Sequence, residues 1–383
     1  MGNWAELLED LLVGIAKQIP ALEDFVAFGG VCRSWRLVAI KHNFKGSQQT
    51  PWLMLSEQEG EENTSERRIV SLTKGGMVRK LALPGARGKR CFESLGWFIT
   101  VSEHGEMELL HPFSQAQIPL PHINTFKYYV KNGSMEDNFI FIRKAVLSYS
   151  PDDALGNKDH VVMVIYGGRG WLGFWRPGYK AWTTIETRLA AFYDIVYYNG
   201  RFYGADAAGS IFACDVGGPN ETVARFVGKI PHKFLIDKRP YIVASEAGLL
   251  MVVRDGCLAG YGDDPDFDCD NMDESRIDYG AKEFTLFAVD LNNGGWTEKK
   301  SLGDKALFLG DNASISVQAS EFLRIKANCI YYTDDCWEAY KSFKPGGGKD
   351  MGIYNLEDGS RMPYYGRESF SSICPPIWVN PSF

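Results

Sequence analysis

The feature that most limits the fold of this chain is a strand-turn-strand unit that occurs twice with the same spacing. In residues 198–216, Asn199 and Gly200 suit a two-residue turn with positive φ at both positions. The unit ends in residues 210–216, whose side chains alternate between two faces as in a strand. Residues 95–112 match this unit without a gap. The repeat predicts a fold built from similar sheet units.

Three weaker copies of the unit follow at irregular intervals. They lie at residues 161–177, at 241–255 continued by 284–291, and at 328–335 continued by 351–359. One such unit cannot bury both of its faces alone, so neighbouring units are expected to stack. The pattern predicts a mainly β fold, a kelch-like β-propeller of about six blades over residues 47–383. The alternative is a β-sandwich with chance similarity between its strands.

Both ends of this region carry short apolar runs that suit strands. If the ring closes by pairing the two ends in one blade, residues 52–55 will lie beside strands from the C-terminal copy, which removes an open sheet edge. The polar, acidic residues 57–68 are expected to form an exposed loop after the first run.

Charge and hydropathy exclude several classes of protein. The 383 residues carry a net charge of −7 with a pI near 5.5, which argues against a nucleic-acid partner. No apolar run approaches the roughly 18 residues of a membrane span, and Glu6, Glu9 and Asp10 replace the basic start of a signal peptide. We therefore expect no membrane association and a location in the cytoplasm or nucleus.

Cysteine spacing argues against disulfides and metal sites. No C-x-x-C pair occurs among the eight cysteines, which predicts reduced and mostly buried thiols. The acidic residues 263–274 begin like a calcium-binding loop, but Cys269 and Ser275 occupy positions that require glycine and glutamate. An exposed loop is the better interpretation. No metal or other cofactor is predicted.

Residues 1–46 differ from the rest and predict a small helical module. Leu7, Leu11, Ile15 and Ile19 recur every four residues, an apolar stripe on a helix that Pro20 would end. A second helical face follows at three- and four-residue spacings, comprising Phe25, Phe28, Cys32, Trp35 and Ala39. About 40 residues are too few for a large core, so the module needs a partner or the next domain.

Two stretches of this module resemble an F-box, the helical motif that docks substrate receptors onto the Skp-type adaptor of a cullin-RING ubiquitin ligase. They are Trp-Ala-Glu-Leu-Leu-Glu-Asp-Leu-Leu at 4–12 and Val-Cys-Arg-Ser-Trp-Arg at 31–36. The sequence departs from the pattern at Leu8, where proline is usual. It also departs at Gly29-Gly30, which interrupts a stretch that is often continuous helix, at roughly 1 kcal/mol per glycine.

The resemblance implies an adaptor-docking face and, through the adaptor, a cullin partner. The residues expected to build that face are Leu7, Leu8, Leu11, Leu12, Ile15, Phe25, Val31, Cys32 and Trp35. Some of them must instead form the core of the module, and the sequence does not divide the two sets. The alternative is a helical cap that only packs on the propeller.

The C-terminal third carries a second resemblance. The segments 301–312, 328–335, 351–359 and 375–379 are together similar to the plant F-box family whose C-terminal domain is known as domain of unknown function 295. That resemblance implies a kelch-like propeller that selects an unidentified protein for ubiquitination. Residues 161–166 followed by Gly167-Gly168 also resemble the start of a kelch blade.

One aromatic and basic cluster is the candidate for target binding, because tryptophan and arginine dominate interface hot spots. Its members are Arg169, Trp171, Trp175 and Arg176. The alternative is that both tryptophans pack between blades.

The sequence contains no clear catalytic motif, and no catalytic residues are predicted. The aspartates considered for a propeller hydrolase lie at turns or strand ends, where they commonly cap turns; they are Asp206, Asp215, Asp290, Asp334 and Asp335. The preferred interpretation is a non-catalytic substrate receptor of a Skp–cullin–F-box ligase. The alternatives are a propeller scaffold whose F-box no longer docks, and a propeller enzyme with a helical appendage.

Overall fold

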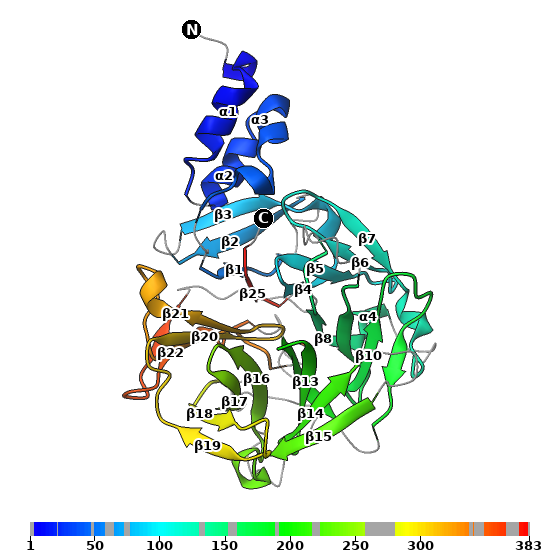
Figure 1. The fold of residues 1–383 in the computed structure, drawn as a ribbon. Coiled ribbons are helices and arrows are strands. Elements are labelled where there is room, and N and C mark those ends of the chain that lie inside the picture. Colours follow the sequence, from blue (N-terminus) through cyan, green and yellow to red (C-terminus); the bar gives the residue numbers. More distant parts are fainter. Residues whose placement is uncertain are drawn as a thin grey trace, which may run out of the picture.

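The computed structural model shows a ring of six β-sheets with a helical module on its outside (Figure 1). The structure describes residues 4–20, 22–46, 50–57, 65–72, 77–129, 135–151, 159–187, 191–216, 223–256, 280–336, 340, 348–364 and 375–381. The predicted six-bladed propeller is thereby confirmed. The acidic residues 263–274 considered for calcium lie outside the described residues, as do Cys257, Cys269 and Cys374.

Each of the first three blades runs from an innermost strand at the ring axis to an outermost strand. Blade 1 consists of β25 (Ile377–Val379), β1 (Trp52–Met54), β2 (Glu66–Ser71) and β3 (Met77–Ala82). Blade 2 consists of β4 (Arg90–Ser94), β5 (Trp97–Val101), β6 (Met107–Leu110) and β7 (Gln117–Leu120). Blade 3 consists of β8 (Ile142–Leu147), β9 (Val162–Tyr166), β10 (Trp171–Trp175) and β11 (Thr183–Ile185).

The other three blades complete the ring. Blade 4 consists of β12 (Phe192–Tyr198), β13 (Arg201–Asp206), β14 (Ser210–Asp215) and β15 (Val223–Lys229). Blade 5 consists of β16 (Arg239–Ser245), β17 (Gly248–Asp255), β18 (Glu283–Val289) and β19 (Trp296–Lys299). Blade 6 consists of β21 (Ser314–Gln318), β20 (Lys305–Leu309), β22 (Cys329–Tyr332), β23 (Gly352–Asn355) and β24 (Arg361–Pro363).

Blade 1 closes the ring by joining strands from both ends of the propeller sequence. β1 pairs antiparallel with β25, with Trp52 opposite Val379 and Met54 opposite Ile377. This confirms the pairing expected for residues 52–55. β2 begins at Glu66, however, so the C-terminal part of residues 57–68 is strand rather than loop, and the Arg67 side chain is buried.

The repeat found in the sequence corresponds to the second and third strands of blades 2 and 4, together with the turn that precedes them. Leu95 and Gly96 join β4 to β5 with φ of 53° and 80°, and Asn199 and Gly200 join β12 to β13 with φ of 46° and 82°. Positive φ at both turn positions matches the twist of the paired strands. The two hairpins therefore present their turns to the same face of the ring.

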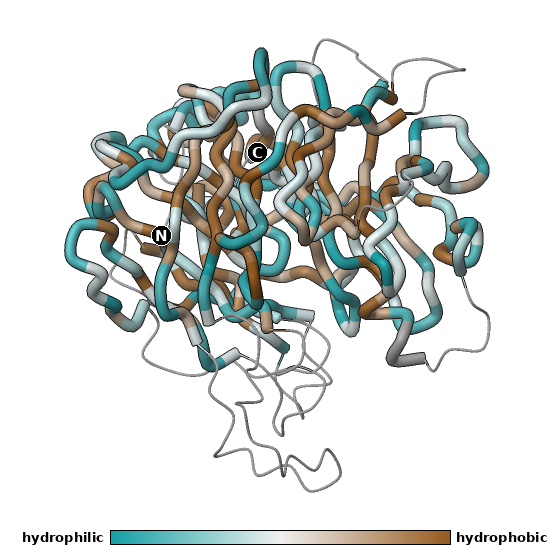
Figure 2. The backbone as a smooth tube through the Cα atoms, turned by 90° about the horizontal axis from the view of Figure 1, so that it is seen from below, coloured by the Kyte–Doolittle hydropathy of each residue, from teal (hydrophilic) through white to brown (hydrophobic). Residues whose placement is uncertain are grey.

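Apolar residues fill the spaces between blades. Figure 2 shows hydrophobic stretches within the strands and hydrophilic ones mainly at the connecting loops. Four of the five described cysteines are buried, and all five are free thiols. Among the described residues, no helix has the length and apolar character needed to cross a membrane.

The helical module lies beside β2 and β3 on the outside of blade 1 (Figure 1). It comprises η1 (Trp4–Glu6), α1 (Glu9–Ala16), α2 (Leu22–Gly29), α3 (Arg33–Val38) and η2 (Lys41–Asn43). The single helical face expected from Phe25 to Ala39 is therefore wrong, because the chain turns between α2 and α3. The shorter helices of the propeller are η3 (Pro84–Ala86), η4 (Ile123–Thr125), α4 (Met135–Phe141), η5 (His232–Phe234) and η7 (Ala319–Glu321).

Candidate functional site

The helical module shares one hydrophobic core with blades 1 and 2. Leu12, Phe25 and Phe28 belong to the same buried cluster as Trp52 of β1 and Ile377 of β25. A module of this size gains most of its buried apolar area from such a neighbour, as the sequence indicated. The core fixes the module on the ring and determines which of its apolar side chains are left outside.

Helix α1 buries a different face from the one its leucine stripe suggests. Leu12 and Ala16, one turn apart, point into the core, and Leu12 is 1% exposed. Leu8 and Leu11 are 72% and 56% exposed, and Ile15 is also exposed. Spacings of three and four residues place these three on one side of the helix. We call Leu8, Leu11 and Ile15 the outer face of α1.

The other predicted docking residues are divided in the same way. Leu7 is half-buried against the shared core and Phe25 is fully buried, whereas Val31 is exposed. Trp35 packs against Phe28 in a tilted arrangement with ring centroids 4.5 Å apart, and it is half-buried. Its indole Nε1 donates a hydrogen bond to the carbonyl of Trp4 over 3.0 Å, so Trp35 fixes the N-terminal turn.

Cys32 lies at the start of α3, where its backbone is extended and forms the N-cap. Its Sγ lies 3.1 Å from the Ser34 Oγ. This hydrogen bond lowers the pKa of the partly exposed Cys32 thiol. Ser34 Oγ also donates to the carbonyl of Ala5 over 3.0 Å. The Cys-Arg-Ser-Trp stretch therefore holds η1 against α3.

The structure accommodates both departures from the F-box pattern, at Leu8 and at Gly29. Leu8 is the N-cap of α1 with φ of −60°, a value that proline also adopts, so the leucine leaves the backbone path unchanged. Gly29 ends α2 where α2 approaches α3. A β-carbon at Gly29 would lie 2.8 Å from the β-carbon of Ala39. The glycine therefore permits the close contact between the helices.

The four residues proposed for target binding do not form one exposed cluster. Trp175 is 5% exposed and Trp171 stacks on Tyr128, both within the core between blades 2 and 3. This is the packing between blades that the sequence left open. Arg169 is exposed, whereas Arg176 is half-buried with its guanidinium 6.0 Å from the Phe174 ring. A role in target binding stays a prediction.

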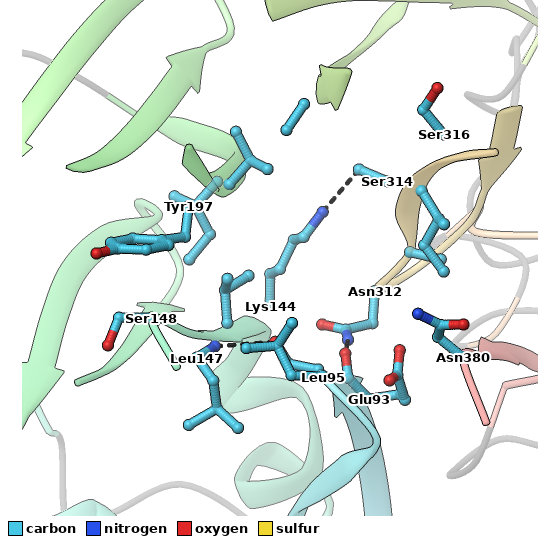
Figure 3. A pocket seen from close by; sticks show the side chains of 17 residues that line it. Glu93, Leu95, Lys144, Leu147, Ser148, Tyr197, Asn312, Ser314, Ser316 and Asn380 are labelled. Atoms are coloured by element: carbon cyan, nitrogen blue, oxygen red, sulfur yellow. Dashed lines mark hydrogen bonds between the residues drawn. The ribbon is translucent and has the colours of Figure 1, made fainter. Parts of the chain in front are cut away.

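A second candidate site lies on the ring axis, where all six blades contribute residues to one cavity of about 260 Å³ (Figure 3). Protein interiors contain few voids larger than a water molecule, so a cavity of this size is a distinct feature. Its lining is Glu93, Ser94, Leu95, Lys144, Val146, Leu147, Ser148, Ile195, Val196, Tyr197, Ala244, Asn312, Ala313, Ser314, Ile315, Ser316 and Asn380.

A buried polar network surrounds this cavity. Lys144 of β8 forms an ion pair with Asp194 of β12, and its Nζ donates to Ser314 Oγ over 2.8 Å. Ser314 in turn donates to Asp194 over 2.7 Å, and the Ile242 backbone N–H donates to the same carboxylate over 2.8 Å. Burial lowers the pKa of Lys144, and the Asp194 carboxylate opposes this shift. The network joins blades 3, 4, 5 and 6.

The tip of the β20–β21 hairpin reaches from blade 6 across to blades 2 and 3. Asp311 forms an ion pair with Arg90 at 2.7 Å, and both side chains are 1% exposed. Asn312 donates through Nδ2 to the Glu93 carbonyl over 2.5 Å and accepts through Oδ1 from the Ala145 N–H over 3.2 Å. The tip thus ties the ring together beside the cavity.

Sequence reasoning missed these axial residues and considered other carboxylates instead. Asp334 accepts backbone N–H groups such as that of Gly348, and Asp335 pairs with Arg254 at 3.1 Å, and neither lines the cavity. Asp206 accepts from the backbone N–H of Ser210, as expected of a turn cap. The missed signal was the presence of charged residues such as Glu93, Lys144 and Asp194 within strands that are otherwise largely apolar.

Comparisons with known proteins agree with this architecture. A sequence model described as the KIB1-4 beta-propeller matches residues 69–355. Putative F-box protein At5g55150 of Arabidopsis thaliana is 26% identical over 398 residues, covering 99% of this chain and 97% of the relative. F-box protein SKIP23 of the same plant is 23% identical, covering 99% and 96%. F-box protein At2g17036, also from Arabidopsis, is 22% identical, covering 100% and 96%.

The family match extends through every blade, because residues 69–355 run from β2 in blade 1 to β23 in blade 6. The alignments with the three plant F-box proteins extend further and include the helical module. The chain is thus a homologue of plant F-box proteins and belongs to the KIB1-4 β-propeller family.

Proposed function

We propose that this chain is the substrate-recognition subunit of a Skp–cullin–F-box ubiquitin ligase. The helical module docks onto a Skp-type adaptor, and through it a cullin, while the propeller holds a target protein. The receptor makes and breaks no covalent bonds. It raises the rate of ubiquitin transfer by holding the target close to the ubiquitin-carrying partner in a fixed orientation.

The observation that carries this proposal is the outer face of α1. Leu8, Leu11 and Ile15 remain exposed although the same helix buries Leu12 in the shared core. A contiguous group of exposed leucine and isoleucine side chains on a short helix is typical of a protein-binding surface. Arabidopsis relatives that align with almost the whole chain, module included, are F-box proteins, which supports the same interpretation.

The shared core supports the proposal in a second way. Buried side chains of α1 and α2 pack together with those of β1 and β25, so the module is held firmly on blade 1. The Arg79 guanidinium of β3 also lies 3.4 Å from the Asp24 carboxylate of α2. A firmly mounted module would give a bound target a defined position relative to the adaptor.

The test is co-purification of the full chain with a Skp-type adaptor. We compare the wild type with the double variant Leu8→Asp/Leu11→Asp, which places two charges on the outer face without touching the core. Leu12 is excluded from this test because it is buried. We expect stable capture by the wild type and at least about a hundred-fold loss for the variant, since each buried hot-spot residue contributes ~2 kcal/mol.

Leu323→Asp is the matched control, since Leu323 is 97% exposed on blade 6, away from the module. It should bind the adaptor as the wild type does. Equal capture of the double variant and the wild type would contradict docking through the outer face. No capture by the wild type would favour a propeller scaffold that acts by binding alone.

A further inference from the structure

The axial cavity contains one buried acidic group, Glu93, that forms no ion pair among the described residues. Glu93, at the end of β4, is 7% exposed and lines the cavity. In the described part of the chain, no lysine, arginine or histidine forms an ion pair with its carboxyl, which accepts the Gly96 N–H over 2.9 Å and interacts with the Asn380 backbone. Burial raises the pKa of Glu93 to about 8.

The other charged groups beside the cavity are already paired. Lys144 is matched by Asp194, and Arg90 by Asp311, so each pair has a net charge of zero. An anionic ligand would therefore find no unpaired positive charge among the described residues at the cavity. A cationic ligand would find Glu93, because a buried carboxyl becomes ionised when an opposite charge approaches it.

The shape and lining of the cavity limit the size of that ligand. Its volume of about 260 Å³ lies below the ~300–1,000 Å³ of pockets for drug-sized molecules, and suits a single side chain. Leu95, Val146 and Ile315 line the cavity and provide aliphatic surface. Ser316 and Asn380 provide hydrogen-bonding groups (Figure 3). This combination suits a flexible hydrocarbon stem that ends in a hydrogen-bond donor.

We propose that the axial cavity binds a lysine side chain of the target protein, with the Glu93 carboxylate as counter-ion to its ammonium group. This inference rests on the proposed role of the propeller as the target-binding part. The lysine stem packs against Leu95, Val146 and Ile315 at the face of the ring where the innermost hairpins turn. The Lys144–Asp194 pair stays intact and holds the walls of the cavity.

Proton balance gives the site a pH dependence. When the ammonium enters at neutral pH, Glu93 releases its proton to solvent and becomes the counter-ion. Lys144 and Asp194 compensate each other, as do Arg90 and Asp311. The remaining titratable group of the lining is the Tyr197 hydroxyl, which donates to the Tyr149 hydroxyl and whose pKa is raised by burial.

Binding should therefore tighten as the pH rises towards 8.5, where a free lysine side chain is still positively charged. The expected gain in affinity between pH 6.5 and 8.5 is about ten-fold. A ligand without an ammonium group should show no such gain.

The experiment uses two small probes with the full-length protein and ligand-observed NMR titration. Nα-acetyl-L-lysine methylamide carries the ammonium, and Nα-acetyl-L-norleucine methylamide has the same stem without it. We expect the lysine probe to bind at least ten-fold more tightly than the norleucine probe. Equal binding of the two probes, or no binding of the lysine probe, would overturn the proposal.

Glu93→Gln tests the counter-ion, since glutamine keeps the size of the side chain and an oxygen that can accept the Gly96 N–H. This substitution should weaken the binding of the lysine probe at least ten-fold and abolish the pH dependence of that binding. Glu103→Gln removes an exposed carboxylate elsewhere and should change neither. Wild-type affinity in Glu93→Gln would assign the binding to another site and refute this one.

The two proposals fail separately. Adaptor capture depends on the outer face of α1, and probe binding depends on Glu93. A protein that binds the lysine probe but not the adaptor contradicts the ligase role alone. A protein that binds the adaptor but does not bind the lysine probe would contradict only the proposal of the lysine site.

Discussion

The helical module and the axis of the ring differ in the kind of group that each leaves without a partner. The module has exposed apolar side chains, and the axis has a buried carboxyl. The module buries Leu12 and Phe25 but leaves Leu8, Leu11 and Ile15 exposed to water. The axis pairs Lys144 with Asp194 and Arg90 with Asp311, whereas the buried Glu93 carboxyl has no cationic partner among the described residues. An exposed apolar group gains by burying area against a broad partner. A buried carboxyl gains only from a small, well-placed cation.

The two proposals give one chain two kinds of partner. The outer face of α1 suits a large and mainly apolar partner surface. The affinity of such a contact depends little on pH. The axial cavity suits a single charged side chain. The affinity for that side chain depends on proton release from Glu93. The following predictions test this contrast, beginning with the largest effect.

Leu11 and Leu12 are neighbours in sequence but should differ most in their effect on stability. Leu12→Asp places a carboxylate in the shared core and should lower the free energy of unfolding of the module by about 4 kcal/mol. Leu11→Asp changes an exposed side chain and should alter it by less than about 0.5 kcal/mol. Thermal unfolding followed by circular dichroism compares the two variants. Similar losses in both would mean that α1 does not bury the Leu12 face.

Breaking the axial ion pair between Lys144 and Asp194 should destabilise the propeller strongly. Lys144→Met leaves the Asp194 carboxylate buried without its cation and should cost about 3 kcal/mol. Adding Asp194→Asn should recover part of this loss, because the amide oxygen still accepts a backbone N–H and carries no charge. Urea unfolding of the three proteins measures the coupling. A double variant less stable than Lys144→Met alone would show that the charge of Asp194 is not the cause.

Glu93 should make the stability of the ring depend on pH. Between about 4.5 and 8 the unfolded chain releases the Glu93 proton while the folded protein keeps it, so this group lowers stability as the pH rises. The slope is at most ~1.4 kcal/mol per pH unit. Urea unfolding at pH 5 to 8 should show that the free energy of unfolding of the Glu93→Gln variant increases relative to that of the wild type as the pH rises. Parallel curves would mean that Glu93 is ionised in the folded state.

The smallest effect concerns the exposed side of α1. Gly14 lies within the helix, and a β-carbon there meets nothing within 4 Å. Gly14→Ala should therefore stabilise the module by about 0.5–1 kcal/mol. Gly29→Ala is the contrasting change, since its β-carbon would clash with Ala39 and should destabilise by ~1–3 kcal/mol. Melting curves of the two variants that shift in the same direction would contradict the packing of α2 on α3.

Much of the ring was predictable because local rules specify it. Alternating side chains and the Leu95-Gly96 and Asn199-Gly200 turns indicate hairpins, and repeated hairpins need neighbours to cover their faces. The pairing of β1 with β25 follows from the same need to remove an open edge. These features depend on residues near one another in sequence or on the general requirements of a closed sheet.

The division of the apolar residues of α1 was not predictable, because almost every side of the helix carries a leucine or isoleucine. Which side is buried depends on where blade 1 meets the helix. That contact involves side chains such as Ile69 and Val379, far away in the sequence. Periodicity indicates that a helix is amphipathic only when polar residues mark its other face.

The axial site was hidden for a related reason. Glu93, Lys144 and Asp194 are about 50 residues apart from one to the next, and each lies in a different strand. No spacing rule connects them, because the ring takes one strand from each blade to its axis. A search for charged residues in the innermost strand of each repeat would have found all three.

The pairing of β1 with β25 also sets an order of events during synthesis. β25 is the last of the described strands to leave the ribosome, and it contributes Ile377 and Val379 to the core that supports α1 and α2. Until those residues arrive, the helices lack part of their support, although they were made first. A nascent or truncated chain would thus hold α1 and α2 less firmly than the finished protein does.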